Sequence, residues 1–267
     1  MRTPRRGVGR QIEPAHRAML PDMHASSLAG ASHFVAQVLG EVQRRLLPPR
    51  CLLCAAPGDG MDLCADCRAE LPLNTVCCAH CALPLAHPAA RCGVCLRQEP
   101  AWDGAWAPYR YGWPLDRLES RFKFSAALAA GRVLGELWAG HALPLRPDCL
   151  VPVPLHRTRL RARGYNQALE LARMLARHHH LALRPGLLRR VRATSAQTEL
   201  DAKTRRRNVR GAFEARTGTG LPAHVALIDD VMTTGATLSE CARVLKRAGV
   251  QRVEAWALAR APLPRRG

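Results

Sequence analysis

Nine of the eleven cysteines in this 267-residue chain are concentrated between Cys51 and Cys95. Eight of them form four C-x-x-C pairs, namely Cys51 and Cys54, Cys64 and Cys67, Cys78 and Cys81, and Cys92 and Cys95. Two such pairs supply four thiolates at the corners of a tetrahedron, which suits zinc, and metal binding can provide the folding energy that so short a segment lacks. We therefore expect about two zinc ions. Four cysteines leave no open coordination position, so both sites are expected to be structural.

The sequence permits two ways of combining the four pairs. Sequential ribbons use Cys51 to Cys67 for one site and Cys78 to Cys95 for the other, whereas a cross-braced arrangement uses the same residues in alternation. We favour the sequential arrangement because it closes the shorter loops. Cys77 stands beside Cys78 and is an alternative ligand, while His80 and His87 are expected to be bystanders.

The amino-terminal part of the chain has no apolar export signal, and eleven is an odd number of cysteines. A cytoplasmic metal-binding protein is therefore favoured over a disulfide-linked one. Residues 1–32 are expected to form a disordered extension, with Met19 or Met23 as alternative starts. Residues 33–49 carry apolar side chains at helical spacing and predict an amphipathic helix. No membrane span is expected, because no run of about 18 apolar residues occurs.

The formal net charge is +19, from 40 Lys and Arg residues against 21 Asp and Glu. This excess favours a polyanionic partner such as single-stranded DNA, because basic side chains release counterions from phosphates. However, only three of the basic residues are lysines, and the chain is rich in Ala, Arg, Pro and Gly, as a GC-rich genome would produce. A solvated basic surface is an equally open interpretation. The few aromatic residues form no platform pattern for stacking bases.

After the cysteine module (50–100), strand-like and helix-like segments alternate over residues 101–262. The segments are a helix-like stretch over 115–143, a strand over 149–153, a helix over 166–179, a basic segment over 189–210, a strand over 225–228, a helix over 237–248 and a strand over 253–258. This alternation predicts an α/β fold with a parallel sheet. Cys149 and Cys241 fall on apolar faces and are expected to be buried.

The segment VALIDDVMTTGAT, residues 225–237, is the sharpest single pattern in the chain. An apolar strand ends in Asp229 and Asp230 and turns through small residues into a helix. Thr237 with Glu240 matches a capping box at the start of that helix. The turn presents backbone N–H groups and hydroxyls at a helix amino terminus, which predicts an anion-binding site.

Two adjacent carboxylates are unfavourable for a bare phosphate. At about 6 Å and an effective dielectric constant near 20, each would repel a phosphate charge by roughly 2 to 3 kcal/mol. The ligand must therefore offer hydrogen-bond donors or a cation to Asp229 and Asp230. A sugar diol supplies the donors and a hydrated magnesium ion supplies the charge, so a ribose 5-phosphate satisfies both demands.

This segment resembles the phosphoribosyl pyrophosphate motif of type I phosphoribosyltransferases, two acidic residues followed by T-[TS]-G-[GA]-T. The segments PVPLH (152–156), RGYNQ (163–167) and RRNVRGAF (206–213) resemble the ComF family, in which a cysteine-rich zinc module precedes a phosphoribosyltransferase domain. The resemblance covers roughly residues 45 to 260. Its motifs are specific in combination, whereas the aspartate motif alone identifies only the wider superfamily.

The resemblance implies a type I phosphoribosyltransferase fold with a parallel, Rossmann-like sheet that binds phosphoribosyl pyrophosphate with magnesium. It implies a ribose contact by Asp229 and Asp230, a pyrophosphate loop that includes His156, and a mobile loop whose cations stabilise the departing pyrophosphate. The implied 5-phosphate loop consists of Thr233, Thr234, Gly235, Ala236 and Thr237, and the candidate cations are Lys203, Arg205 and Arg206.

Two functional hypotheses follow from the resemblance to competence-associated proteins. The first is an enzyme that transfers a phosphoribosyl group to an acceptor that the sequence leaves open. The second is a non-catalytic binder of phosphoribosyl ligands or single-stranded DNA that serves DNA uptake, with proteins of the competence machinery as partners.

Overall fold

The computed structural model describes residues 48–124, 127–193, 202–216 and 220–263. The expected extension over 1–32 and nearly all of the expected helix over 33–49 lie outside these residues. The described chain beyond Pro48 forms one compact unit. The division into modules at about residue 100 stays a prediction.

The centre of this unit is a parallel sheet with strand order β1-β8-β7-β3-β4, in which β2 also pairs with β8. All pairings within this sheet are parallel, so the predicted α/β fold class is confirmed. The strands are β1 (Gly104–Trp106), β2 (Tyr109–Arg110), β3 (Cys149–Pro152), β4 (Ala182–Leu183), β7 (His224–Met232) and β8 (Arg252–Arg260).

The central strand β7 explains how the sheet is covered on both sides. Side chains alternate between the two faces of a strand, and here Val225 and Leu227 join one buried cluster while Ala226 and Ile228 join another. All four are fully buried. A continuous apolar run of this kind is typical of a parallel strand with helices on both faces.

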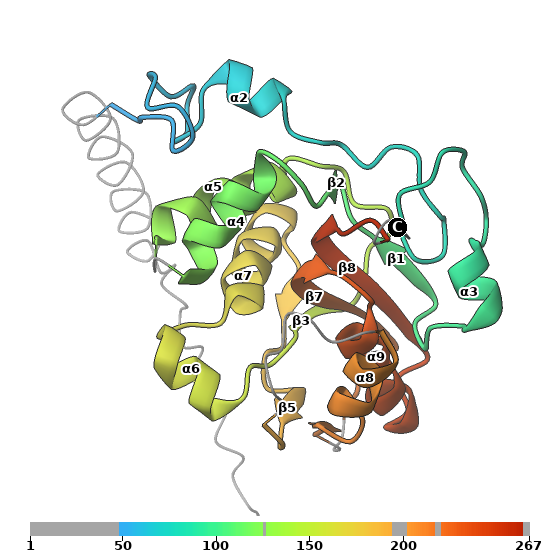
Figure 1. Cartoon of the computed structure of the whole chain (residues 1–267). Coiled ribbons are helices and arrows are strands. Elements are labelled where there is room, and N and C mark those ends of the chain that lie inside the picture. The colour runs from blue at the N-terminus through green and yellow to red at the C-terminus, as the bar shows by residue number, and fades with distance from the viewer. Residues whose placement is uncertain (1–47, 125–126, 194–201, 217–219, 264–267) are drawn as a thin grey trace, which may run out of the picture. The chain divides into compact units, whose positions relative to one another are not determined.

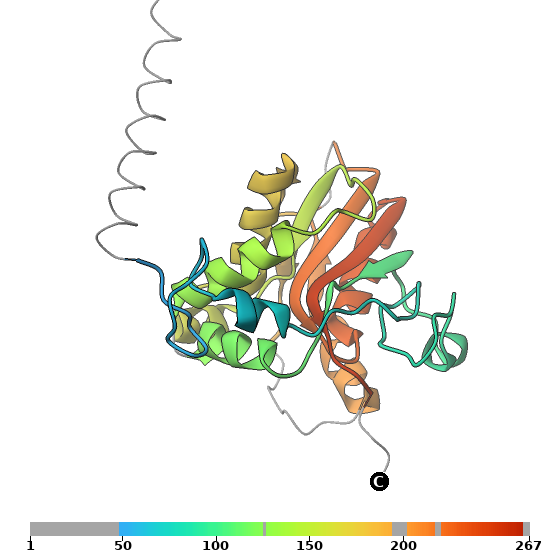
Figure 2. The same cartoon turned by 90° about the horizontal axis from the view of Figure 1, so that it is seen from above.

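Helices α4 (Leu115–Phe124), α5 (Leu128–Ala139) and α7 (Gln167–His179) contribute to the cluster on one face, and α9 (Ala236–Arg247) contributes to the other (Figures 1 and 2). The stretch predicted as helix-like over 115–143 is helical but is not one continuous helix. Two helices occupy this stretch, and Phe122 of the first packs where a Cβ on Gly131 of the second would lie, 2.3 Å away. The tertiary contact between these helices therefore requires a break that apolar periodicity does not reveal.

The cysteine module contributes to both faces of the sheet. Leu63 and Leu71, near the short helix α2 (Ala65–Ala69), belong to the α4–α5–α7 cluster. Leu83, in the half that ends in the short helix α3 (Gly93–Arg97), belongs to the α9 cluster. The two halves therefore pack against opposite faces.

The described residues of the basic segment and those directly after it form three elements. An antiparallel pair, β5 (Leu188–Arg190) with β6 (Phe213–Ala215), brackets the helix α8 (Ala202–Val209). A further short helix, α6 (Arg157–Arg163), follows β3.

The start of α9 differs from the prediction. The helix begins at Ala236 with Gly235 as its N-cap, and Gly235 has no side chain to form a cap. Thr237 therefore lies inside the first turn and the predicted capping box is wrong. Glu240 instead accepts a hydrogen bond from the backbone N–H of Gly211 at 2.9 Å and pairs with Arg243.

Candidate functional site

The cysteine pairs form two compact clusters in the order predicted for sequential ribbons. In each cluster the four sulfur atoms lie within 4.8 Å of one another. Both clusters fit structural zinc, and Cys77, His80 and His87 belong to neither. The clusters are Cys51, Cys54, Cys64 and Cys67, and Cys78, Cys81, Cys92 and Cys95. All four sulfur ligands of the second cluster come from buried residues, whereas Cys54 of the first is exposed.

Asp229 and Asp230 lie near the carboxyl end of β7, the central strand of the sheet. In open parallel sheets, ligands bind in the crevice outside this edge. Asp229 Oδ1 accepts a hydrogen bond from the backbone N–H of Asp230 at 3.0 Å, and Asp230 Oδ1 accepts one from Val231 at 2.6 Å. Each carboxylate thus keeps its second oxygen for other partners.

Helix α4 brings two further charged residues to this pair. Lys123 Nζ lies 3.1 Å from Asp230 Oδ2 and 3.1 Å from Glu119 Oε2. The Glu119 side chain is completely buried, and burial followed by repulsion from Asp230 raises its pKa to about 7. Burial lowers the pKa of Lys123, but the charges of Asp230 and Glu119 outweigh it and the pKa is raised. Lys123 therefore stays protonated and offsets the acidic charge.

Asp229 has a perturbed titration. Burial, and then the negative charge of Asp230, raise the pKa of Asp229 to about 8, although Lys123 acts in the opposite direction. A carboxylate in such a setting gains most from a ligand that donates hydrogen bonds or carries positive charge.

The loop between β7 and α9 has a backbone shape that depends on Gly235. This residue has φ +71°, in the left-handed region, and a Cβ at this position would lie 2.6 Å from Cη2 of Trp102. Thr234 Oγ1 accepts a hydrogen bond from the backbone N–H of Ala236 at 3.3 Å. Thr233 is exposed and Thr237 is half-buried. The loop therefore turns tightly against the indole and delivers small residues to the helix start.

Two side chains join this loop to the second cysteine cluster. Trp102 Nε1 donates to the carbonyl of His80 at 3.0 Å. Arg260, at the end of β8, donates to the carbonyl oxygens of Cys81 at 3.1 Å and Met232 at 2.9 Å, and also to that of Thr233. The cysteine knuckle and the loop therefore share one buried guanidinium.

The remaining predicted site residues lie on α6 and α8. His156 is the N-cap of α6, with Nδ1 2.9 Å from Thr158 Oγ1, so it has a local structural role. Its role as a ligand stays a prediction. The side chains of Lys203 and Arg205 lie outside the described residues. Arg206 belongs to α8 and lines a groove beside the loop.

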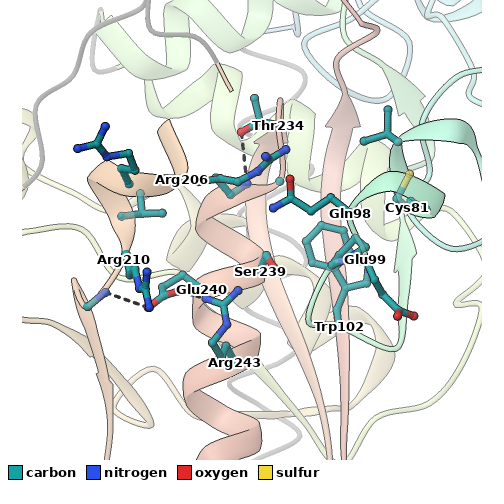
Figure 3. Close-up of a pocket in the computed structure, with 18 of the residues that line it drawn as sticks. Cys81, Gln98, Glu99, Trp102, Arg206, Arg210, Thr234, Ser239, Glu240 and Arg243 are labelled. Carbon is teal, nitrogen blue, oxygen red and sulfur yellow. Dashed lines mark hydrogen bonds and ion pairs between the residues drawn. The ribbon is translucent and has the colours of Figure 1, made fainter. Parts of the chain in front are cut away.

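This groove has a volume of about 500 Å³. Figure 3 shows that α9 forms its floor, with Ser239 and Arg243, while Arg206 and Arg210 lie on one side and Gln98 and Trp102 on the other. Thr234, Gly235 and Ala236 close one end. The acidic pair is not part of its lining, so the groove and the carboxylates present different chemistry.

Sequence reasoning did not identify Glu119, Lys123, Trp102 or Arg260. Glu119 and Lys123 carry a usable signal, since they are four residues apart on a helix whose neighbours Leu118 and Phe122 are buried. A buried ionisable residue is a candidate for a functional site.

Comparisons with known proteins agree with this organisation. A family model described as a double zinc ribbon domain matches residues 42–96. The chain is 38% identical over 209 residues to competence protein F of Haemophilus influenzae, covering 74% of this chain and 90% of that protein. It is 34% identical over 226 residues to the DNA utilization protein YhgH of Salmonella typhimurium, covering 80% and 98%.

A more distant match is the competence protein ComFC of Bacillus subtilis, 31% identical over 144 residues and covering 53% of this chain and 57% of that protein. No helix among the described residues is long and apolar enough to cross a bilayer. Together with the two cysteine clusters and the parallel sheet, these matches show that the chain belongs to the ComF family of competence proteins.

Proposed function

We propose that this protein binds phosphoribosyl pyrophosphate at the carboxyl edge of its sheet. The observation that carries the proposal is one continuous stretch of chain, in which Asp229 and Asp230 near the end of the central strand β7 are followed by the residues 233–237, which turn into the start of α9. The two carboxylates accept hydrogen bonds from the ribose 2- and 3-hydroxyls. Backbone N–H groups of the loop bind the 5-phosphate at the helix amino terminus.

Lys123 supports this role by setting the charge of the site. Its ammonium group bridges Asp230 and the buried Glu119, and so reduces the repulsion that two aspartates would exert on a phosphate. Asp229, whose pKa is raised, is left as the carboxyl group that gains most from a hydroxyl donor.

Magnesium belongs to this proposal as a companion of the ligand. Among the described residues, only the two cysteine clusters bring three or more potential metal ligands together. Asp230 is already paired with Lys123. The carboxylates alone therefore do not fit a preformed magnesium site. Magnesium usually keeps several waters and binds through substrate phosphates, so it would arrive on the pyrophosphate.

Phosphoribosyl transfer is the reaction that such a ligand allows. The acceptor forms a bond to C1 of the ribose while the bond from C1 to pyrophosphate breaks, and cations stabilise the leaving charge. Lys203, Arg205 and Arg206 are the proposed cations. The alternative is a binder that performs no transfer.

The biological setting that we propose is DNA uptake in the cytoplasm. The relatives bear the names competence protein F and DNA utilization protein, and the chain has a net charge of +19. Single-stranded DNA and proteins of the competence machinery are the corresponding partners.

Calorimetry with phosphoribosyl pyrophosphate and magnesium tests the proposal directly. Replacing both Asp229 and Asp230 with Asn keeps the size of the side chains but removes the carboxylate acceptors, and a measurement above pH of about 8 keeps Asp229 of the wild type ionised. Hydrogen bonds to charged groups contribute roughly 1.5 to 3 kcal/mol each, so affinity should fall at least tenfold. Unchanged or tighter binding by a folded double variant would overturn the assignment.

A second measurement separates the enzyme from the binder. Magnesium-dependent release of pyrophosphate, assayed with a panel of acceptor nucleophiles, is expected only if transfer occurs. Tight binding without release under any acceptor identifies a non-catalytic ligand-binding protein.

A further inference from the structure

The geometry points to a second anion site, which we propose binds a chain of two or more phosphates in the groove between α8, α9 and the end of α3. This site goes beyond the ribose site, because its basic side chains come from α8, from Arg210 directly after it, from α9 and from the end of β8, and none comes from the loop or from β7. The groove shares Thr234, Gly235 and Ala236 with the proposed phosphate loop, and it shares Arg206 with the proposed transfer cations.

The charge of the groove lining is the first argument. The acidic residues that line it are already paired, Glu240 with Arg243 and with the backbone of Gly211, and Glu99 with Arg91 at 2.6 Å. Arg260 is buried and donates to backbone carbonyls, and the four arginines of the lining that remain besides it and Arg243 have no acidic partner among the described residues. They are Arg206, Arg207, Arg210 and Arg247.

The arrangement of these arginines is the second argument. Arg243 and Arg247 lie four residues apart on α9, and Arg206 and Arg210 lie four residues apart at the end of α8, where the backbone N–H of Arg210 donates to the carbonyl of Arg206. A helix rises about 6 Å over four residues. The α9 floor and the α8 side of the groove therefore each present two guanidinium groups, one turn apart, and Figure 3 shows Arg206, Arg210 and Arg243 around the same space.

A single small anion would neutralise only part of this surface. Guanidinium groups bind phosphate oxygens through charge-assisted, often bidentate hydrogen bonds, and a ligand with several phosphates contacts the arginines of α8 and of α9 at once. The volume of about 500 Å³ lies in the range of small-molecule sites.

The described residues that line the groove do not offer a surface for stacking bases. Trp102 is the aromatic residue in its lining, and it is only 4% exposed. Recognition must therefore depend on phosphate groups and not on nucleobases. A free phosphate chain and the backbone of a single-stranded nucleic acid share this chemistry.

The test uses the full-length zinc-loaded protein and two probes, inorganic triphosphate and single-stranded oligothymidine, without magnesium. The groove variant is Arg210→Glu with Arg247→Glu, both at exposed positions. The control is Arg117→Glu with Arg177→Glu, which has the same net charge and also changes exposed arginines, on α4 and α7. Circular dichroism and zinc content check that both are folded.

We expect the wild type to bind at least one probe, the groove variant to bind it at least tenfold more weakly, and the control to stay within about threefold. Binding of triphosphate alone identifies a free phosphate chain as the ligand. Binding of oligothymidine identifies a nucleic-acid backbone. In that case the plot of log affinity against log salt concentration should be less steep for the groove variant than for the wild type, by about 1.4 for two lost phosphate contacts.

Three outcomes would overturn the proposal: no binding of either probe by the wild type, equal binding by the groove and control variants, or loss of probe binding only in the Asp229→Asn, Asp230→Asn variant. The last outcome would place the anion at the ribose site. If that double variant still binds the probe but no longer binds phosphoribosyl pyrophosphate, the groove and the ribose site are two separate sites.

Discussion

Arg260 and Cys81 are 179 residues apart in the sequence and share a 3.1 Å hydrogen bond from Nε of the arginine to the cysteine carbonyl. The same guanidinium donates to the carbonyls of Met232 and Thr233, which lead into the candidate phosphate loop. Arg260 is 4% exposed, so these bonds form without competition from water. The second zinc ribbon is therefore part of the support for the loop, whereas the first packs with α4 and α5.

This difference predicts unequal effects of removing one ligand from each ribbon. Cys81→Ser and Cys54→Ser should each leave about one zinc per chain in elemental analysis, because each breaks one four-cysteine site. Cys81→Ser should also weaken binding of ribose 5-phosphate ligands by at least tenfold, and Cys54→Ser by less than about threefold. Equal losses of affinity in calorimetry would contradict the support that we assign to the second ribbon.

Gly235→Ala should destabilise the protein through two separate causes. The left-handed backbone costs an alanine about 1 to 2 kcal/mol, and the contact with Trp102 adds an overpacking cost of about 1 to 3 kcal/mol. Gly164→Ala is the matched control, because Gly164 also has positive φ, +84°, but a Cβ there meets nothing within 4 Å. Urea denaturation should therefore show a larger decrease in the free energy of unfolding for Gly235→Ala than for Gly164→Ala. Equal decreases would mean that the Trp102 side chain can move away from the added methyl group without destabilising the protein.

Lys123→Met should be strongly destabilising, because it leaves the buried carboxylate of Glu119 and the carboxylate of Asp230 without their cation. Breaking a buried pair on one side costs about 3 to 5 kcal/mol. The control is Lys246→Met, since Lys246 pairs with Asp103 where both side chains are about one-third exposed and such pairs contribute about 1 kcal/mol or less. Adding Glu119→Gln to Lys123→Met should recover part of the free energy of unfolding. If Lys123→Met lowers the free energy of unfolding by no more than Lys246→Met does, solvent screens the charges of Glu119, Lys123 and Asp230.

Asp229 should make stability depend on pH in a defined direction. Its pKa is about 8 in the folded protein and about 3.9 in an unfolded chain, so the folded state binds the proton more tightly. The stabilisation from this proton is complete below the unfolded pKa and is lost as the pH rises through the folded pKa. The free energy of unfolding of Asp229→Asn should therefore rise relative to the wild type between pH of about 4 and about 8, and the difference should stay constant above that range. Denaturation curves at a series of pH values measure the difference, and one that does not vary with pH would refute the raised pKa.

The sequence alone determined those features of this protein that depend on residues close together in the chain. The C-x-x-C spacing fixes which sulfur atoms can meet, and the apolar run of β7 followed by two aspartates and a small-residue turn fixes a strand, an acidic pair and a helix start. For this reason the amino-acid sequence predicts the two cysteine clusters, their sequential pairing and the parallel α/β class.

Tertiary structure decided which distant residues complete these local features. The break between α4 and α5 follows from the contact of Phe122 with Gly131, and the glycine cap of α9 leaves Glu240 to bind Gly211. Lys123 reaches Asp230 only because α4 packs beside the carboxyl end of β7, and Arg260 reaches Cys81 only because β8 ends beside the second ribbon. Local periodicity carries no information on such pairings, since they depend on how layers of structure stack and on which buried charge needs a partner once water is excluded.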